Sequence, residues 1–286
     1  MKYLVVKGWL GFGDRLESLK MAVKYALTYN LQIYVDWRDP MWSHGSEDFY
    51  TYFKLVNMPV LNSLDDIPED ATYYPAYWKG NLDKHLTYDF VTEHANDNLN
   101  LDVISKPFDA DVVVYSCMGY RKLYNDCEFF GDVFRVIDHR ILTKVKQHYN
   151  AYPVSTSWGI HIRGTDRIHD RRRLMSIQSI VSNVTSNGGM NKAHMVVVSD
   201  DNEHTQMWKN YYPNSYIVSN FSIETRKGNH NLSKEELSVS KDQLNMEMLI
   251  DFFVLTKCER VFTTIKDSRY AQEARRLHPV VDKILS

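Results

Sequence analysis

The first 36 residues have the pattern of a strand, a helix and a second strand. Residues 3–6 form a short β-branched and aromatic run, and glycines follow between residues 8 and 13. Apolar residues then recur at helical spacing as far as residue 26, and a second apolar run at residues 31–35 ends at Asp36. Parallel strands need a helical crossover between them, so this pattern predicts a β-α-β unit that begins a doubly wound sheet.

The second half of the chain repeats this alternation, whereas residues 37–107 have a weaker pattern interrupted by prolines. Strands are expected at 111–115, 158–162, 195–198, 215–219 and 261–264, and helices at 137–149, 174–184, 202–211, 246–256 and 268–277. Alternation at this spacing indicates α/β domains with parallel sheets. We therefore expect a Rossmann-like domain over residues 1–150 and a second over 151–286, with a last helix that can return to the first domain.

Composition excludes several classes of protein. The 34 Lys and Arg residues are balanced by 36 Asp and Glu residues, so no global basic field attracts nucleic acid. The apolar runs are far shorter than the ~20 residues of a membrane span, and the N-terminal run is shorter than a secretory apolar region. Three cysteines cannot all pair. We expect a cytoplasmic protein that neither enters a membrane nor binds nucleic acid.

The glycine-rich segment at residues 8–13 lies between the first strand and the first helix. Gly11 and Gly13 would allow a ligand close to the backbone, where a helix N-terminus offers unpaired N–H groups to an anion. The segment is not a dinucleotide fingerprint because Leu16 stands at the third glycine position, and no P-loop lysine follows. A purely structural turn is the alternative.

A basic segment begins at the end of the strand expected at 158–162. His161-Ile-Arg-Gly-Thr-Asp-Arg is followed by further arginines at 171–173, so five guanidinium groups lie within eleven residues. Guanidinium groups bind phosphate oxygens bidentately. An exposed, acid-paired loop is an equal alternative for residues 171–173, whereas the position of Arg163 just beyond a buried strand favours a ligand.

Two more strand ends carry polar residues. Asp200 and Asp201 follow one strand, and either could accept hydrogen bonds from a nucleoside or cap the next helix. Thr264, Ser268 and Arg269 lie between the last strand and its helix, where hydroxyl and cationic groups could hold phosphate, again with capping as the alternative.

No pattern indicates a metal site or a covalent nucleophile. The histidines lack the spacing of zinc ligands, Asp36 and Asp39 alone do not make a cation site, and no Gly-x-Ser-x-Gly motif occurs. We therefore expect no metal and no cofactor.

Together these segments resemble the superfamily of α1,6-, O- and nodulation-type fucosyltransferases, which are GT-B glycosyltransferases. The matching residues are Gly11-Phe-Gly-Asp-Arg-Leu-Glu-Ser-Leu with Val35-Asp-Trp-Arg, the segment from His161 to Arg167, Val198-Ser-Asp-Asp, and Asp251 through Thr264 with Ser268. Residues 40–130 are not covered. The chain departs from the family pattern by having Arg167 in place of the usual lysine, and Asp170-Arg171 where some relatives carry a catalytic glutamate.

The resemblance implies two Rossmann-like α/β domains that face a central cleft, and an inverting, metal-independent transfer of a sugar from a nucleoside diphosphate to a glycan hydroxyl. The donor would be GDP-fucose, with a UDP-linked sugar such as UDP-xylose as the alternative. The family places Arg163 on the β-phosphate, supported by His161 and Asp166. It also places Asp200 or Asp201 on the nucleoside, and Thr264 and Ser268 on the diphosphate. From the residues themselves we add Gly11, Gly13, Arg167 and Arg269 as donor-binding candidates.

For the catalytic base we favour Asp170, with Asp14 as its competitor, and we expect the acceptor to contact Asp36, Trp37 and Arg38. Two other functions stay open at this point. A carbohydrate-binding protein without catalysis would keep aromatic platforms but release no nucleotide. An RNA-binding module that uses residues 171–173 would show strongly salt-dependent binding.

Overall fold

The computed structural model describes residues 2–94, 107–116, 126–164, 175–189, 194–219 and 232–286. The chain divides into two compact units, the first formed by Met1–Ile137 with Asp282–Ser286 and the second by Asp138–Val281. The division falls before helix α5 (His139–Ala151), whereas the sequence predicts a boundary between residues 150 and 151, at the end of that helix.

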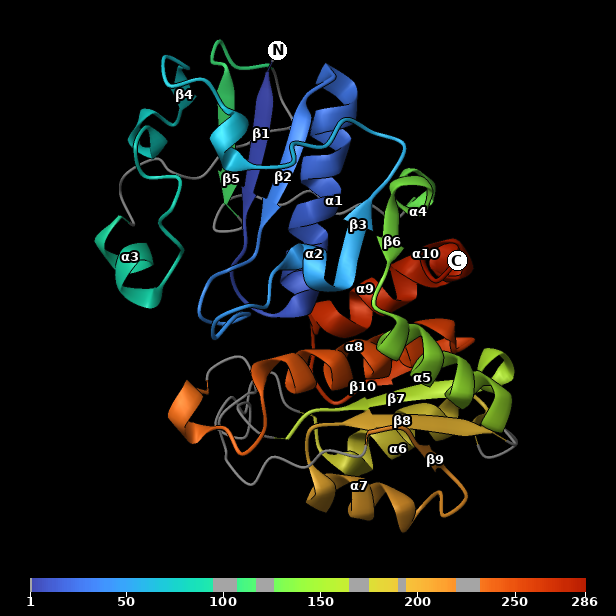
Figure 1. Ribbon diagram of the computed structural model, residues 1–286. Helices are drawn as coiled ribbons and strands as arrows, with labels where there is room; N and C mark the ends of the chain where they lie inside the picture. Colours follow the sequence, from blue (N-terminus) through green and yellow to red (C-terminus); the bar gives the residue numbers. More distant parts are fainter. Residues whose placement is uncertain (1, 95–106, 117–125, 165–174, 190–193, 220–231) are drawn as a thin grey trace. The chain divides into compact units, whose positions relative to one another are not determined.

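The first unit contains a parallel four-stranded sheet in the order β2-β1-β5-β4 (Figure 1). Its strands are β1 (Tyr3–Lys7), β2 (Gln32–Asp36), β4 (Tyr73–Tyr74) and β5 (Val112–Ser116). Helix α1 (Phe12–Tyr29) connects β1 to β2, in register from Tyr3 opposite Gln32 to Lys7 opposite Asp36. This is the β-α-β unit that the sequence predicts.

Shorter elements complete the first unit, and the weak sequence pattern did not predict them. Strands β3 (Phe53–Leu55) and β6 (Phe134–Val136) pair antiparallel. The short helices are α2 (Phe49–Tyr52), η1 (Leu64–Asp66), η2 (Ala76–Trp78), α3 (Tyr88–Glu93) and α4 (Glu128–Val133). A core that includes Trp9, Trp78 and Val112 packs η1, η2 and α3 against the sheet.

The second unit contains a parallel sheet in the order β10-β7-β8-β9. Its strands are β7 (Trp158–Ile162), β8 (Met195–Ser199), β9 (Tyr216–Ile217) and β10 (Arg260–Thr263). Its helices, besides α5, are η3 (Val154–Thr156), α6 (Ile177–Ser186), α7 (Asn202–Lys209), η6 (Lys234–Glu236), α8 (Lys241–Lys257), α9 (Arg269–Leu277) and η7 (His278–Val280). The last helix, α10 (Val281–Ile284), belongs to the first unit from Asp282 onward. Helices α5 and α8 cover one face of the sheet, and α6 and α7 cover the other (Figure 1).

Helix α8 begins five residues before the expected position because Ser240 caps it. The Ser240 side chain accepts a hydrogen bond from the Gln243 backbone N–H, so the polar residues before the apolar run are also helical. No helix in the described part of the chain combines the length and the apolar character needed to cross a membrane.

The strand order places a topological switch point in each sheet. In the second unit the chain proceeds from β7 outward through β8 to β9 and then returns to add β10 on the other side of β7. In the first unit β1 has the same position, between β2 and β5. Ligands of open α/β sheets bind beyond the carboxyl ends of the strands at such points, so the residues after β7 and β1 are the first candidates for a site.

Candidate functional site

The end of β7 is joined to the end of β10 at the switch point of the second unit. The Arg163 backbone N–H donates to Thr264 Oγ1 over 2.9 Å, and the Thr264 N–H donates to the His161 carbonyl over 3.0 Å. Thr264 is 1% exposed. Its hydroxyl therefore fixes the backbone of Arg163, and the diphosphate contact that the resemblance implies for Thr264 stays a prediction.

The Arg163 guanidinium lies at the open edge of the sheet, beside the end of β8. Its Nε is 3.9 Å from Asp200 Oδ2, and the two side chains are 24% and 18% exposed. Asp200 Oδ1 also accepts a hydrogen bond of 2.9 Å from the Gly164 N–H. The ends of three adjacent strands thus hold a partly exposed cation beside a carboxylate.

Asp200 and Asp201 have separate roles, which the sequence left open. Asp201 caps α7 by accepting hydrogen bonds from the backbone and the imidazole of His204, at 3.1 and 2.9 Å. Gly164 packs directly against it, since a Cβ at position 164 would lie 2.6 Å from Asp201 Cγ. Asp201 is therefore the helix cap, and Asp200 is the carboxylate that faces Arg163.

His161 packs beneath the surface of this edge, in contact with β10 and α9, as a neutral imidazole. It is 7% exposed, its Nδ1 lies 2.9 Å from Thr263 Oγ1, and its ring stacks on Tyr270 with centroids 5.0 Å apart. Burial lowers the pKa of His161 to about 3, and repulsion from Arg163 and Arg275 acts in the same direction. At neutral pH this side chain carries no charge, so it can position the loop but cannot act as a cation.

The start of α9 shows the capping role that the sequence offered as an alternative. The Ser268 side chain accepts a hydrogen bond of 3.3 Å from the Ala271 N–H, and Arg269 is the first helical residue. Ser268 is only 9% exposed. Donor binding by Ser268 or Arg269 stays a prediction.

Asp251 on α8 was not among the predicted site residues, although the third matching segment begins with it. Its carboxylate accepts a hydrogen bond from the Ser219 hydroxyl, and Ser219 Oγ in turn accepts from the Ser199 N–H at 2.9 Å. Burial raises the pKa of Asp251 to about 8; the charges of Glu247 and Asp200 add to the rise, and the Ser219 bond opposes it. The available sequence signal was that Asp251 is the single charged residue in the otherwise apolar run at residues 248–255.

Several predicted residues lie outside the described part of the chain. These are Asp166, Arg167, the favoured base Asp170 and the arginines at 171–173. Their predicted roles stay predictions.

In the first unit, the glycine-rich segment forms the start of α1. Gly11 is the N-cap residue, Gly13 is buried in the first turn, and Asp14 is the acidic residue of that turn. Among the described residues, a Cβ on Gly11 would come within 4 Å of Asp14 Oδ2 alone, so the position beside Gly11 is not crowded by them. The geometry is compatible with an anion at the helix N-terminus, and the roles of Gly11, Gly13 and Asp14 stay predictions.

The predicted acceptor residues differ in how accessible they are. Asp36 is 2% exposed and pairs with Lys7 Nζ at 2.7 Å and with Arg38 Nε at 2.8 Å. Trp37 is 1% exposed and packs edge-on against rings that include Trp42 at 5.1 Å, so its ring is core and offers no face to a sugar. The Arg38 side chain is 41% exposed and is the member of this group that can meet a ligand.

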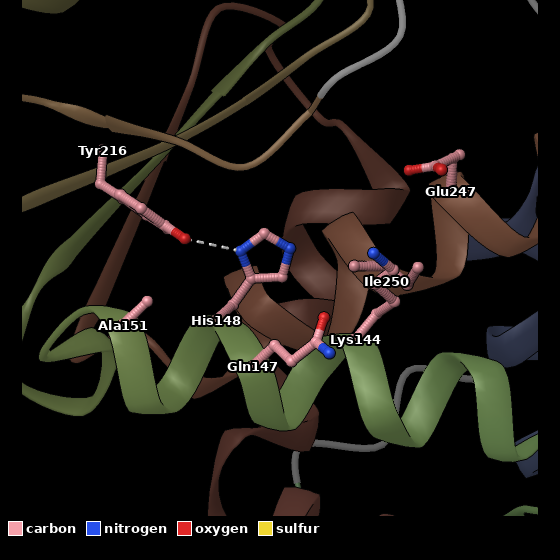
Figure 2. A pocket seen from close by; sticks show the side chains of 7 residues that line it. All are labelled: Lys144, Gln147, His148, Ala151, Tyr216, Glu247 and Ile250. Atoms are coloured by element: carbon pink, nitrogen blue, oxygen red, sulfur yellow. Dashed lines mark hydrogen bonds between the residues drawn. The ribbon is translucent and has the colours of Figure 1, made fainter.

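A pocket of about 210 Å³ lies apart from these residues, between α5, α8 and the edge strand β9 (Figure 2). His148 Nδ1 is 2.9 Å from the Tyr216 hydroxyl across it. Its lining residues are Lys144, Gln147, His148, Ala151, Tyr216, Glu247 and Ile250. No sequence prediction falls on this pocket. The described residues contain no cluster of His, Cys, Asp and Glu side chains that could hold a metal ion.

The parallel sheets and their helices together have the fold of the GT-B fucosyltransferases. Fucosyltransferase NodZ from Bradyrhizobium is similar over 96% of this chain and 92% of its own, with a TM-score of 0.68 and 16% sequence identity. NodZ α-1,6-fucosyltransferase co-crystallised with GDP gives a TM-score of 0.70 at 16% identity over the same shares of both chains. POFUT1 in complex with GDP is more distant, with a TM-score of 0.56 and 11% identity over 98% of this chain and 96% of its own. No protein-family model and no curated protein matches the sequence.

Proposed function

We propose that this protein transfers fucose from GDP-fucose to a hydroxyl group of a glycan. The observation that carries the proposal is Arg163, a partly exposed guanidinium fixed through Thr264 at the switch point of a parallel sheet. Similarity in fold to fucosyltransferases whose structures contain GDP, or were obtained by soaking with GDP-fucose, supports this choice of donor. Nothing comparable supports UDP-xylose.

In the proposed reaction the bond between C1 of fucose and the β-phosphate oxygen breaks, and the bonding electrons leave with GDP. Arg163 would stabilise the added charge on the leaving diphosphate by bidentate hydrogen bonds, which makes a metal ion unnecessary for that step. The acceptor oxygen forms the new bond to C1 from the opposite face, so the configuration inverts. The acceptor proton passes to a carboxylate base, for which Asp170 and Asp14 remain the candidates.

The carboxyl groups near Arg163 suit the base of the donor. Guanine presents adjacent N–H groups at N1 and N2, which a carboxylate can accept together, whereas uracil presents a single N–H. Asp200 lies beside Arg163, and its charge contributes to the raised pKa of Asp251. We propose that the Asp200 carboxylate faces the nucleoside, whereas Asp201 serves as a helix cap and Asp251, which keeps its proton at neutral pH, is not an acceptor for guanine.

The test is a transfer assay with GDP-fucose and a panel of oligosaccharides, in which GDP release and the mass of the glycan are both measured. We expect a mass increase of one fucose and release of one GDP for each transfer. Arg163→Ala should reduce the rate by about 10²–10³-fold, as for loss of an electrostatic clamp. Gln147→Ala, in the separate pocket of Figure 2, is the control for the same unit and should transfer at the wild-type rate.

A protein that binds the oligosaccharides but releases no GDP would be the carbohydrate-binding alternative. Full activity of Arg163→Ala would remove the proposed role of that residue.

A further inference from the structure

The segment from Trp78 to Tyr88 passes over the carboxyl ends of β1 and β2 in the first unit. Lys7 Nζ donates a hydrogen bond to the Leu82 carbonyl and lies 5.4 Å from the centre of the Trp78 ring. Further along the segment, His85 Nδ1 lies 3.7 Å from Asp36 Oδ2. These contacts fix the segment to the switch point of the sheet, where ligands of α/β folds bind.

Three side chains of this edge reach solvent. The Arg38 side chain is 41% exposed and the His85 side chain 32% exposed. Tyr88 is 61% exposed, although it is a large aromatic residue, and it contacts Trp9 edge to face with ring centroids 5.2 Å apart. Trp9 itself is 4% exposed. A buried ring in the segment that follows β1 therefore supports an exposed ring at the start of α3.

Buried charges hold the polar members of this group in place. The Asp36 carboxylate accepts from Arg38 Nε at 2.8 Å and from Lys7 Nζ at 2.7 Å. Burial lowers the pKa of His85, and the repulsion of Lys7 and Arg38 acts with it against the attraction of Asp36. A neutral imidazole can both donate and accept a hydrogen bond.

We propose that Arg38, His85 and Tyr88 of the first unit form a subsite for one sugar ring of the acceptor. The Tyr88 ring covers the apolar face of the sugar, and Arg38 and His85 exchange hydrogen bonds with its hydroxyl groups. The role as acceptor site rests on the proposed function, whereas sugar binding at these residues does not. The assignment replaces Trp37 by Tyr88 as the aromatic contact, because the Trp37 ring is enclosed in the core.

Saturation-transfer NMR with the methyl glycosides of glucose, galactose and N-acetylglucosamine at millimolar concentration tests this subsite directly. We expect at least one of the three to bind the wild-type protein. Tyr88→Phe keeps the ring and should bind it equally, whereas Tyr88→Leu should bind it roughly three- to tenfold more weakly, as for the loss of one stacked aromatic contact. Arg38→Gln and His85→Ala should each weaken binding as well.

The matched control is Tyr211→Leu, because Tyr211 is 47% exposed and belongs to the second unit. It should bind the glycoside as the wild type does. Equal binding by Tyr88→Leu and Tyr88→Phe overturns the proposal, and so does the absence of binding of all three glycosides to the wild type.

A GDP titration of the same proteins separates this proposal from the proposed function. We expect GDP to bind wild type and Tyr88→Leu with equal affinity. Glycoside binding that depends on Tyr88 in a protein that does not bind GDP would support the subsite and contradict the fucosyltransferase assignment. GDP binding without glycoside binding would support the fucosyltransferase assignment and contradict the subsite.

Discussion

Replacing Thr264 by valine tests whether the hydroxyl between β7 and β10 positions Arg163. The substitution keeps the shape of the side chain but removes the acceptor of the 2.9 Å hydrogen bond from the Arg163 N–H. An amide left without its partner in a buried site costs about 1–3 kcal/mol. Because Arg163 is partly exposed rather than buried, we expect a loss near the lower end, about 1–2 kcal/mol of unfolding free energy.

Thr264→Ser is the matched variant because it keeps the hydroxyl and loses one methyl group. Burial of a methyl group contributes about 1 kcal/mol, so the two variants should be destabilised by similar amounts in urea unfolding. GDP affinity should separate them. Thr264→Val should weaken GDP binding about three- to tenfold, because a displaced Arg163 loses part of the binding free energy of a charge-assisted hydrogen bond. Thr264→Ser should leave GDP affinity unchanged.

Calorimetric titration of GDP into the two variants, beside urea unfolding of each, is the assay. Wild-type GDP affinity in Thr264→Val, together with the expected loss of stability, would refute the argument. Thr264 would then join the strands without acting on Arg163.

Three further outcomes follow from the same structure. Asp251 should lower the unfolding free energy as pH rises from 3.8 toward about 8, because folded Asp251 keeps a proton that the unfolded chain releases. Neutral His161 acts in the opposite direction up to its ordinary pKa of 6.5, so Asp251 is isolated by the variant Asp251→Asn, which should gain stability relative to the wild type between about pH 5 and about pH 8. Urea unfolding of both proteins at these two pH values measures the difference, and identical slopes would contradict the raised pKa. Arg15 is 1% exposed, and both of its terminal nitrogens donate to the Asp39 carboxylate at 2.7 Å. Asp39→Ala leaves this buried charge without its carboxylate and should lower the unfolding free energy by about 3–5 kcal/mol in thermal or urea unfolding. A loss below about 1 kcal/mol would show that water reaches the site. Gly164→Ala should displace Asp201 from its cap and lower stability by about 1–2 kcal/mol, whereas an unchanged melting temperature would show that the loop adjusts without loss.

The sequence predicts the helices and strands correctly where apolar residues recur at a regular spacing over several residues. Helix α1 and the strands on either side of it follow from apolar residues at two distinct spacings. Strands β3, β4 and β6 were not predicted because two or three residues cannot display a period, and pairing with distant segments defines them. The domain boundary was placed late for a related reason, since the packing of α5 rather than a loop composition decides where it belongs.

At the site, sequence position located the correct strand ends but could not assign roles to neighbouring residues. Asp200 and Asp201 are adjacent carboxylates, and only the geometry separates the Arg163 partner from the helix cap. Trp37 lies beside the partly exposed Arg38, yet its ring is enclosed by the core. Asp251 was missed because its link to Ser219 joins residues that are 32 positions apart in the chain.

We propose above that Arg163 holds the diphosphate of a guanosine nucleotide at the switch point of the second unit. Calorimetric titration of GDP and UDP into the wild-type protein and Arg163→Gln tests it most directly. The account predicts that GDP binds the wild type more tightly than UDP, and that the substitution weakens GDP binding by roughly tenfold or more, the value of a charge-assisted contact to phosphate. Equal GDP affinity in the two proteins, or tighter binding of UDP than of GDP, would contradict it.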